Sequence, residues 1–201
     1  MAHELKNVCV YCGSAEGNDP RFAAAADACG TALAEAGVGL VYGGGSLGLM
    51  GRVARAAMAA GGTVLGVIPR FLHEREVMLR EVSELIVTAD MHERKRIMFE
   101  RSDGFVALPG GVGTLEELVE MLTWSQLGQH DKPVVLANIG AFWDPLNTLI
   151  EHMKAAGFIR PGWDVSYDVV PTVDALIPTL IERHKILAAE RTPKKGTLER
   201  L

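Results

Sequence analysis

The chain has 201 residues and a formal net charge of −5, and its length is typical of one compact domain. The negative charge argues against bulk attraction to nucleic acid or anionic lipid, so neither is an expected partner. Hydrophobic residues make up 48% and charged residues 22% of the chain, which is typical of a globular protein rather than a disordered one. Glycine is in excess, with 22 residues, roughly 11% against about 7% on average.

The termini and the cysteines exclude several classes of protein. The N-terminal segment, Met1–Lys6, lacks the apolar core of a signal peptide, and no apolar stretch reaches the ~18 residues of a membrane span. Three cysteines, Cys9, Cys12 and Cys29, cannot form a closed disulfide framework, which favours a reducing cytoplasm. Cys9 and Cys12 have CxxC spacing, but residues three apart on a strand point to opposite faces. We therefore expect buried thiols rather than a redox or zinc motif.

Short apolar runs alternate with helical patterns along the chain. The pattern predicts strands at Asn7–Cys12, Gly39–Tyr42, Thr63–Ile68, Leu85–Thr88, Gly104–Ala107, Pro133–Ala137 and, more weakly, Val169–Val170. It predicts helices at Pro20–Ala36, Leu49–Ala60, Met91–Arg101, Leu115–Leu127, Trp143–Ala156 and Val173–Ala188. Strands that are apolar throughout are typical of a parallel sheet covered on both faces. We expect an α/β fold, a Rossmann-like doubly wound parallel sheet in a single domain at 1–190, followed by a flexible tail at 191–201.

Three glycine-rich segments each separate a predicted strand from the next helix. They are Gly13-Ser14, Gly43–Gly51 and Pro109–Thr114. The carboxyl ends of parallel strands lie at one edge of the sheet, so these loops are expected to meet there. Glycine lets backbone N–H groups approach an anion, and a helix N-terminus supplies free donors and partial positive charge. Three such loops favour a phosphate or nucleotide site over tight turns alone.

The glycine loops do not match the usual motifs for large nucleotides. Gly43–Gly48 contains GxGxxG, but Thr63–Pro69 has no acidic residue to close a dinucleotide site. Neither Gly43–Gly51 nor Pro109–Thr114 is followed by the lysine of a P-loop. A smaller phosphorylated ligand therefore fits better than NAD or ATP.

Glu117 has two competing interpretations. With Thr114 it matches a helix capping box, which is a structural role. Helical periodicity places the core-facing stripe at Leu115, Leu118, Val119 and Leu122. Glu117 then falls on the opposite face with Met121 and Trp124. An acid beside exposed apolar residues predicts a cleft near a partner subunit, and hence a homodimer with the site near its interface.

A basic run, Met91–Arg96, opens the helix before the fifth predicted strand, and it is placed to project over the same edge of the sheet. Arginine is suited to bidentate contacts with phosphate or carboxylate, which favours a functional role for Arg94. For Arg96, a functional role and a solvated surface stay open. The histidines considered as metal ligands lack the necessary spacing, so no metal site is expected; they are His3, His92, His130 and His152.

The segment Pro109–Glu117, PGGVGTLEE, resembles the PGGxGTxxE signature of the "Lonely guy" family, the cytokinin riboside 5′-monophosphate phosphoribohydrolases. Met91–Lys95 resembles the companion motif of that family. The resemblance extends from Val8 to about Leu180 and includes Arg75-Glu76. Members are often labelled lysine decarboxylases, but nothing in this sequence points to a pyridoxal phosphate site, and no cofactor is expected.

The resemblance implies a catalytic pair, Arg94 and Glu117. It implies that the 5′-phosphate binds to the segment Gly111–Thr114, that is, to Gly111, Val112, Gly113 and Thr114. The other residues expected at the substrate site are Ser14, Gly45, Glu76, Met91, Lys95, Gly110 and Thr123.

Cleavage of an N-glycosidic bond builds positive charge on the ribose. Glu117 would stabilise that charge, orient the ribose hydroxyls or activate water, and these roles stay open. Guanidinium stays protonated, so Arg94 either holds the phosphate or orients Glu117, and the group that protonates the leaving base stays open. We predict hydrolysis of AMP or an N6-prenylated analogue to free base and ribose 5-phosphate. The alternatives are a non-catalytic nucleotide or cofactor carrier and a general AMP nucleosidase.

Overall fold

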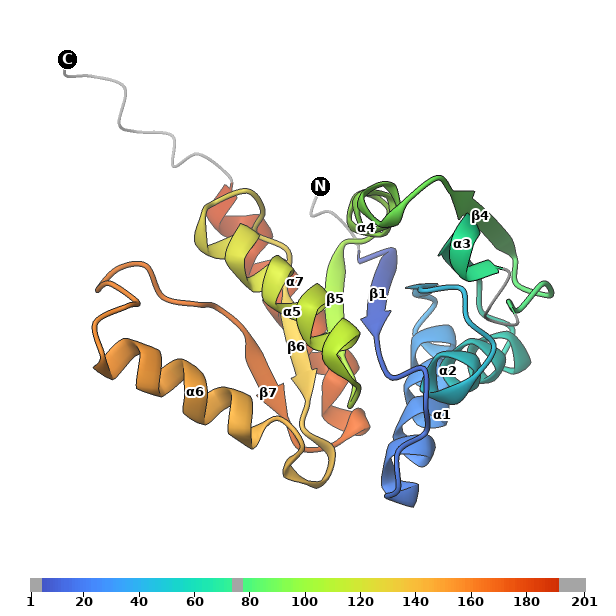
Figure 1. Cartoon of the computed structure of the whole chain (residues 1–201), viewed down its shortest axis with the longest axis horizontal. Coiled ribbons are helices and arrows are strands. Elements are labelled where there is room, and N and C mark those ends of the chain that lie inside the picture. Colours follow the sequence, from blue (N-terminus) through green and yellow to red (C-terminus); the bar gives the residue numbers. More distant parts are fainter. Residues whose placement is uncertain (1–4, 74–77, 192–201) are drawn as a thin grey trace, which may run out of the picture.

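The computed structural model describes residues 5–73 and 78–191. Its centre is a seven-stranded, all-parallel sheet in the order β4-β3-β2-β1-β5-β6-β7 (Figure 1). The strands are β1 (Asn7–Tyr11), β2 (Gly39–Tyr42), β3 (Val64–Pro69), β4 (Glu84–Thr88), β5 (Gly104–Ala107), β6 (Val134–Ala137) and β7 (Asp168–Val170). Glu76 and residues 192–201 of the predicted tail lie outside the described residues.

Helices cover both faces of the sheet. They are α1 (Pro20–Glu35), α2 (Gly48–Ala59), α3 (Arg70–His73), α4 (Met91–Glu100), α5 (Val112–Gln126), α6 (Asp144–Ala155) and α7 (Leu176–Arg191), with short 3-10 turns η1 (Ile139–Ala141) and η2 (Val173–Ala175). Helices α1, α2 and α7 pack on one face, and α4, α5 and α6 pack on the other. The predicted doubly wound fold is therefore confirmed. Within the described residues, no helix is both long and apolar enough to cross a membrane.

Alternate residues of each strand enter the two halves of the core. On β1, Val8 packs under α1 and α2, whereas Cys9 packs under α4 and α5. Cys12 joins the half of the core that contains Val8, so the CxxC pair is divided between the two faces as predicted. The three cysteines are free and buried, and burial raises the pKa of the Cys29 thiol to about 12.

The glycine loops meet at the carboxyl edge of the sheet. The order of strands reverses between β1 and β5, so the loops that follow these two strands lie side by side. Gly13 N–H donates to the carbonyl of Pro109 at 3.1 Å, and Met50 N–H donates to the carbonyl of Gly13 at 3.3 Å. These contacts join the loops after β1 and β5 and the first turn of α2, and they leave the N-terminus of α5 at the same edge.

The face that α5 presents to the sheet differs from the prediction. The buried residues of this helix are Thr114, Glu117, Leu118, Met121 and Leu122. Leu115 and Val119, which were expected in the core, are 37% and 43% exposed. Trp124 is half-buried and packs edge-on against Phe99, with ring centroids 5.1 Å apart. The exposed face predicted for Met121 and Trp124 is therefore wrong, because α5 has a wide apolar arc and periodicity does not decide which part meets the sheet.

Candidate functional site

A cavity of ≈ 310 Å³ lies at the carboxyl edge of the sheet, between the loop after β1, helix α4 and the N-terminus of α5. Its lining residues are Cys12, Ser14, Met50, Leu72, Met91, Arg94, Gly111, Val112, Gly113, Thr114, Glu116 and Glu117. Eight of the thirteen site residues expected from the sequence line this cavity. The charged groups come from α4 and α5, and Met50, Leu72 and Met91 form an apolar wall.

Arg94 and Glu117 form a buried ion pair in this cavity. Arg94 Nη1 donates to Glu117 Oε1 at 2.7 Å, and Arg94 Nε donates to the carbonyl of Val67 on β3 at 3.1 Å. The two residues are only 7% and 8% exposed. A Cβ at Gly43 would clash with Arg94 Nη2, so this glycine makes room for the guanidinium. Contacts from two sides thus orient Arg94, and Arg94 in turn orients the carboxylate.

Two opposing effects act on the Glu117 carboxyl. Burial raises its pKa, because the ionised form loses hydration, while the positive charge of Arg94 lowers it. The net direction is upward, and the neighbouring Glu116 adds to it. A carboxylate with a raised pKa is better matched to accept a proton at neutral pH.

The N-terminus of α5 is built differently from the predicted capping box. The helix begins at Val112 with Gly111 at the N-cap, and no side chain caps it. Thr114 is therefore the third helical residue, and Glu117 pairs with Arg94 instead of capping the helix. The first turn of a helix leaves backbone N–H groups without intrahelical partners, and these groups attract anions.

Glycine at positions 111 and 113 is not explained by packing within the chain. A Cβ at Gly111 or Gly113 would meet no atom within 4 Å, and Gly111 has an ordinary φ of −88°. At Gly110, in contrast, a Cβ would collide with the side chain of Thr114. Gly110 therefore serves the packing of the loop, whereas Gly111 and Gly113 leave the cavity side of the backbone open to close approach by a ligand.

Some of the expected site residues lie outside the cavity. Gly45 is buried and pairs with Met78 in an isolated antiparallel bridge. Thr123 is exposed, and its hydroxyl donates to the carbonyl of Val119 at 2.8 Å. Lys95 is turned toward the side chains of α5, where it contacts two carboxylates.

Four lining residues were not among those expected from the sequence: Cys12, Met50, Leu72 and Glu116. Met50 lies within the glycine-rich segment after β2, so its position in the sequence was an available signal. Leu72 comes from α3, a short helix that the sequence pattern did not predict. Apolar residues of this kind carry no chemical motif, and only the fold assigns them to the cavity.

A larger cavity of ≈ 460 Å³ lies at the amino ends of β6 and β7, away from the glycine loops. Its cations are already engaged. Lys132 Nζ donates to the carbonyl of Phe99 at 2.7 Å and lies 3.9 Å from the centroid of that ring, and Arg183 pairs with Asp168 at 2.7 Å. Across the described part of the chain, no group of three or more His, Cys, Asp or Glu residues is placed to hold a metal ion.

The sheet order, the glycine loops and the buried carboxylate beside a helix N-terminus define a Rossmann-like α/β protein with the features of a nucleotide-processing enzyme. The family model described as "Possible lysine decarboxylase" matches residues 50–180. The chain belongs to this family, and its similar relatives carry the name cytokinin riboside 5′-monophosphate phosphoribohydrolase. The resemblance to the "Lonely guy" family is thereby confirmed.

Two relatives illustrate the similarity. Cytokinin riboside 5′-monophosphate phosphoribohydrolase LOG1 of Arabidopsis thaliana is 43% identical over 192 residues, which cover 94% of this chain and 90% of the relative. The phosphoribohydrolase LOG of Oryza sativa subsp. japonica is 50% identical over 178 residues, covering 89% and 74%.

Solved structures share the fold at lower identity. The molybdenum cofactor carrier protein from Chlamydomonas reinhardtii is 26% identical with a TM-score of 0.65, and the match covers 90% of this chain and 98% of that chain. The molybdenum cofactor binding protein from Rippkaea orientalis has a TM-score of 0.66 at 21% identity, covers 88% and 96%, and shows the fold alone.

Proposed function

We propose that the protein hydrolyses the N-glycosidic bond of a purine nucleoside 5′-monophosphate, either AMP or an N6-prenylated analogue, to free base and ribose 5-phosphate. The observation that carries this proposal is the buried Arg94–Glu117 pair, 2.7 Å apart, in the cavity that also contains the N-terminus of α5. The names of the relatives support the same class of reaction.

The 5′-phosphate binds at the start of α5. The backbone N–H groups of Val112, Gly113 and Thr114 lie in the first turn of this helix, where an anion is stabilised by free donors and by the helix dipole. Ser14 lines the same cavity from the loop after β1. With the phosphate held there, the ribose lies within the cavity that contains Glu117.

Glu117 acts on the ribose. As the bond between C1′ and the base nitrogen breaks, its electron pair leaves with the base, and positive charge builds on the ribose. The carboxylate stabilises this charge, and as water adds to C1′ it is also placed to take the proton that water loses. Arg94 orients the carboxylate through its 2.7 Å hydrogen bond. The leaving base takes up a proton as it departs.

The apolar wall of the cavity suits the base. Met50, Leu72 and Met91 line the cavity, and long thioether side chains adapt to flat or branched apolar ligands. A prenyl substituent at N6 would extend this contact. The ratio of kcat/KM for isopentenyl-AMP to that for AMP separates a prenyl-selective enzyme from a general AMP nucleosidase.

Replacement of Glu117 tests the proposal. Glu117→Gln should lower kcat for base release by about 10²- to 10⁴-fold, while AMP binding measured by calorimetry persists. Glu151→Gln is the matched control, because Glu151 pairs with Lys154 on the exposed surface of α6. Base release is followed by chromatography with AMP and isopentenyl-AMP.

The alternative is a carrier that binds a nucleotide or cofactor without cleaving it. The likeness to a molybdenum cofactor carrier protein makes this a concrete rival. A binder of phosphate alone gains little from a buried carboxylate such as Glu117 beside its anion, which favours the enzyme. Wild-type protein that binds both nucleotides and cleaves neither would establish the carrier instead.

We also propose that the protein is a homodimer. The contact surface is the exposed face of α5 and not the face with Met121, which is buried in the core. Val112, Leu115 and Val119 are 83%, 37% and 43% exposed and form an apolar stripe beside the cavity. Thr123 lies at the end of this stripe, so it would approach a nucleotide only in a neighbouring subunit. Light scattering should give twice the chain mass of 21.6 kDa, and Val119→Asp should give the monomer; a wild-type monomer at micromolar concentration refutes the dimer.

The compartment we propose is the cytoplasm. The three cysteines are buried and form no disulfide, which is the state expected in a reducing environment. Cell fractionation of the tagged protein tests this location.

A further inference from the structure

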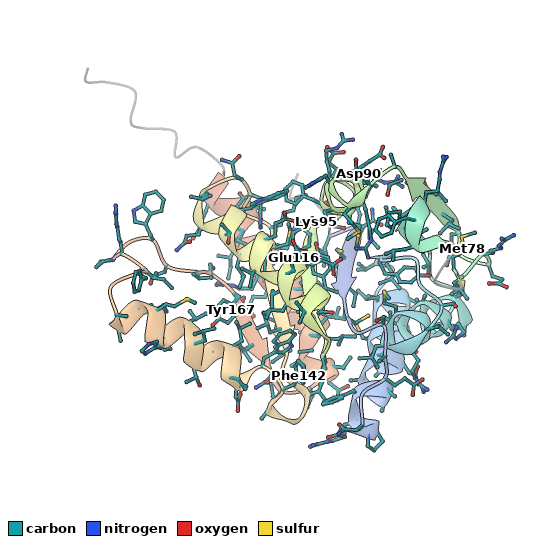
Figure 2. All side chains as sticks on the ribbon, viewed as in Figure 1. Met78, Asp90, Lys95, Glu116, Phe142 and Tyr167 are labelled. Carbon is teal, nitrogen blue, oxygen red and sulfur yellow. The ribbon has the colours of Figure 1, made fainter. Side chains whose placement is uncertain are left out.

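A second ion pair lies beside the Arg94–Glu117 pair. Lys95 follows Arg94 on α4, and Glu116 precedes Glu117 on α5. Lys95 Nζ donates to Glu116 Oε1 at 2.7 Å and to Glu120 Oε1 at 3.0 Å, and Figure 2 shows Lys95 and Glu116 close together between the two helices. Two consecutive cations on α4 thus pair with two consecutive carboxylates on α5, and these pairs join the two helices.

Lys95 makes its contacts at the edge of the cavity rather than in it. Its side chain is only 14% exposed, and Glu120, one turn after Glu116 on α5, also accepts a hydrogen bond from it. Glu116, in contrast, lines the cavity together with Glu117 and the first turn of α5. A free carboxylate at this point would repel the phosphate of a bound nucleotide and would disfavour the ionised form of Glu117.

Few other charges surround Glu117. The titratable groups that face it are Arg94 and Lys95 from α4, Glu116 from α5, and Cys9, Tyr11 and Cys12 from β1 and the loop after it. Burial raises the pKa of both thiols and of the phenol, so these three groups are neutral at physiological pH. The charge balance around Glu117 therefore depends on Arg94, Lys95 and Glu116.

We propose that Lys95 is a positioning residue for the hydrolysis: it holds and neutralises the Glu116 carboxylate, so that neither Glu117 nor the bound phosphate is exposed to that charge. This replaces the direct substrate contact that the family resemblance implied for Lys95. The inference rests on the proposed function, and it assigns to Lys95 an effect transmitted through Glu116, because Glu116 lines the cavity.

Lys95→Met removes the cation that Glu116 and Glu120 share. The affinity for AMP, measured by calorimetry, should fall about tenfold, and the acidic limb of the kcat/KM profile should move to higher pH by about one unit. In a Glu120→Gln background, which removes the charge of the other partner of Lys95, the double variant Lys95→Met/Glu116→Gln removes the cation together with the remaining carboxylate that it contacts, so it should restore both quantities. Lys154→Met, which breaks a pair on α6, should change neither.

A purely structural role for Lys95 predicts a different result. The thermal unfolding temperature of Lys95→Met would then fall without a shift of the pH profile of kcat/KM. Adding Glu116→Gln would restore neither the AMP affinity nor the thermal unfolding temperature, and that outcome overturns the proposal. A direct contact between Lys95 and phosphate is the other contrary outcome, because affinity would stay low in the double variant. The calorimetric measurement of AMP affinity needs no turnover. A protein that binds AMP without cleaving it would therefore contradict the proposed function, and its affinity for AMP would still test the role of Lys95.

Discussion

Replacement of Arg94 by methionine isolates the energetic role of the buried ion pair. Methionine keeps much of the volume and removes the charge, so Glu117 loses its 2.7 Å partner. The side chains of Arg94 and Glu117 are only 9% and 11% exposed, and water therefore does not readily replace the lost hydrogen bond. The folded state must then hold an unpaired carboxylate or bind a proton.

The expected loss of stability depends on pH. Removing one partner of a buried ion pair costs about 3–5 kcal/mol, which is the loss expected at pH 8. As the pH falls, Glu117 in the variant takes up a proton, and the cost falls toward that of a buried neutral group with a missing partner, about 1–3 kcal/mol.

The direction follows from proton linkage. Burial already holds the pKa of Glu117 above its ordinary value of 4.5 in the folded protein, and Arg94 lowers it. Without Arg94 the folded pKa rises further, so above pH 4.5 the folded state binds more protons than the unfolded state. The stability of Arg94→Met is therefore highest at low pH and falls as pH rises from 4.5 through the raised folded pKa.

Urea unfolding at pH 5 and pH 8 measures the loss at each pH. Arg101→Met is the matched control, because Arg101 forms an equally short 2.7 Å pair with Glu84 on the surface, where the two side chains are 45% and 49% exposed. That control should lose no more than about 1 kcal/mol at either pH. A loss for Arg94→Met that equals the control, or that is the same at both pH values, would refute the reasoning.

Two further predictions concern the loops and the core. Gly111→Ala should leave the unfolding free energy within about 0.5 kcal/mol, because its Cβ meets no protein atom, yet weaken AMP binding at least tenfold by calorimetry. Gly43→Ala should lower stability, because its Cβ would clash with Arg94; equal effects of these two substitutions on stability would contradict the packing argument. Burial raises the pKa of the Cys29 thiol to about 12 and raises the pKa of the other two thiols as well. A thiol reagent at pH 8 should therefore modify all three cysteines in denaturant and none within minutes in the native protein, and rapid native labelling would show that the core is open.

Local patterns in the sequence were enough to predict the order of the strands and helices and the edge of the sheet at which the site lies. Continuous apolar runs such as Val134–Ala137 specify buried parallel strands, and glycines such as Gly111 mark the turns into helices. These signals act between residues close in the chain, so they are readable without the fold. The signature at Pro109–Glu117 added the class of protein.

Tertiary packing alone decided which groups meet. Arg94 and Glu117 are 23 positions apart, and Lys95 and Glu116 are 21 apart, so no local pattern pairs them. The apolar residues of α5 span an arc wide enough to satisfy periodicity with either Leu115 or Met121 in the core. The fold buries Met121 together with Glu117, because in this rotation the carboxylate reaches Arg94, whereas the rotation expected from the sequence leaves Arg94 buried without a counter-charge. The sequence by itself therefore determined the order of the strands and helices and the edge of the sheet at which the site lies. The pairing of buried charges, which depends on the tertiary structure, decided the chemistry of the site.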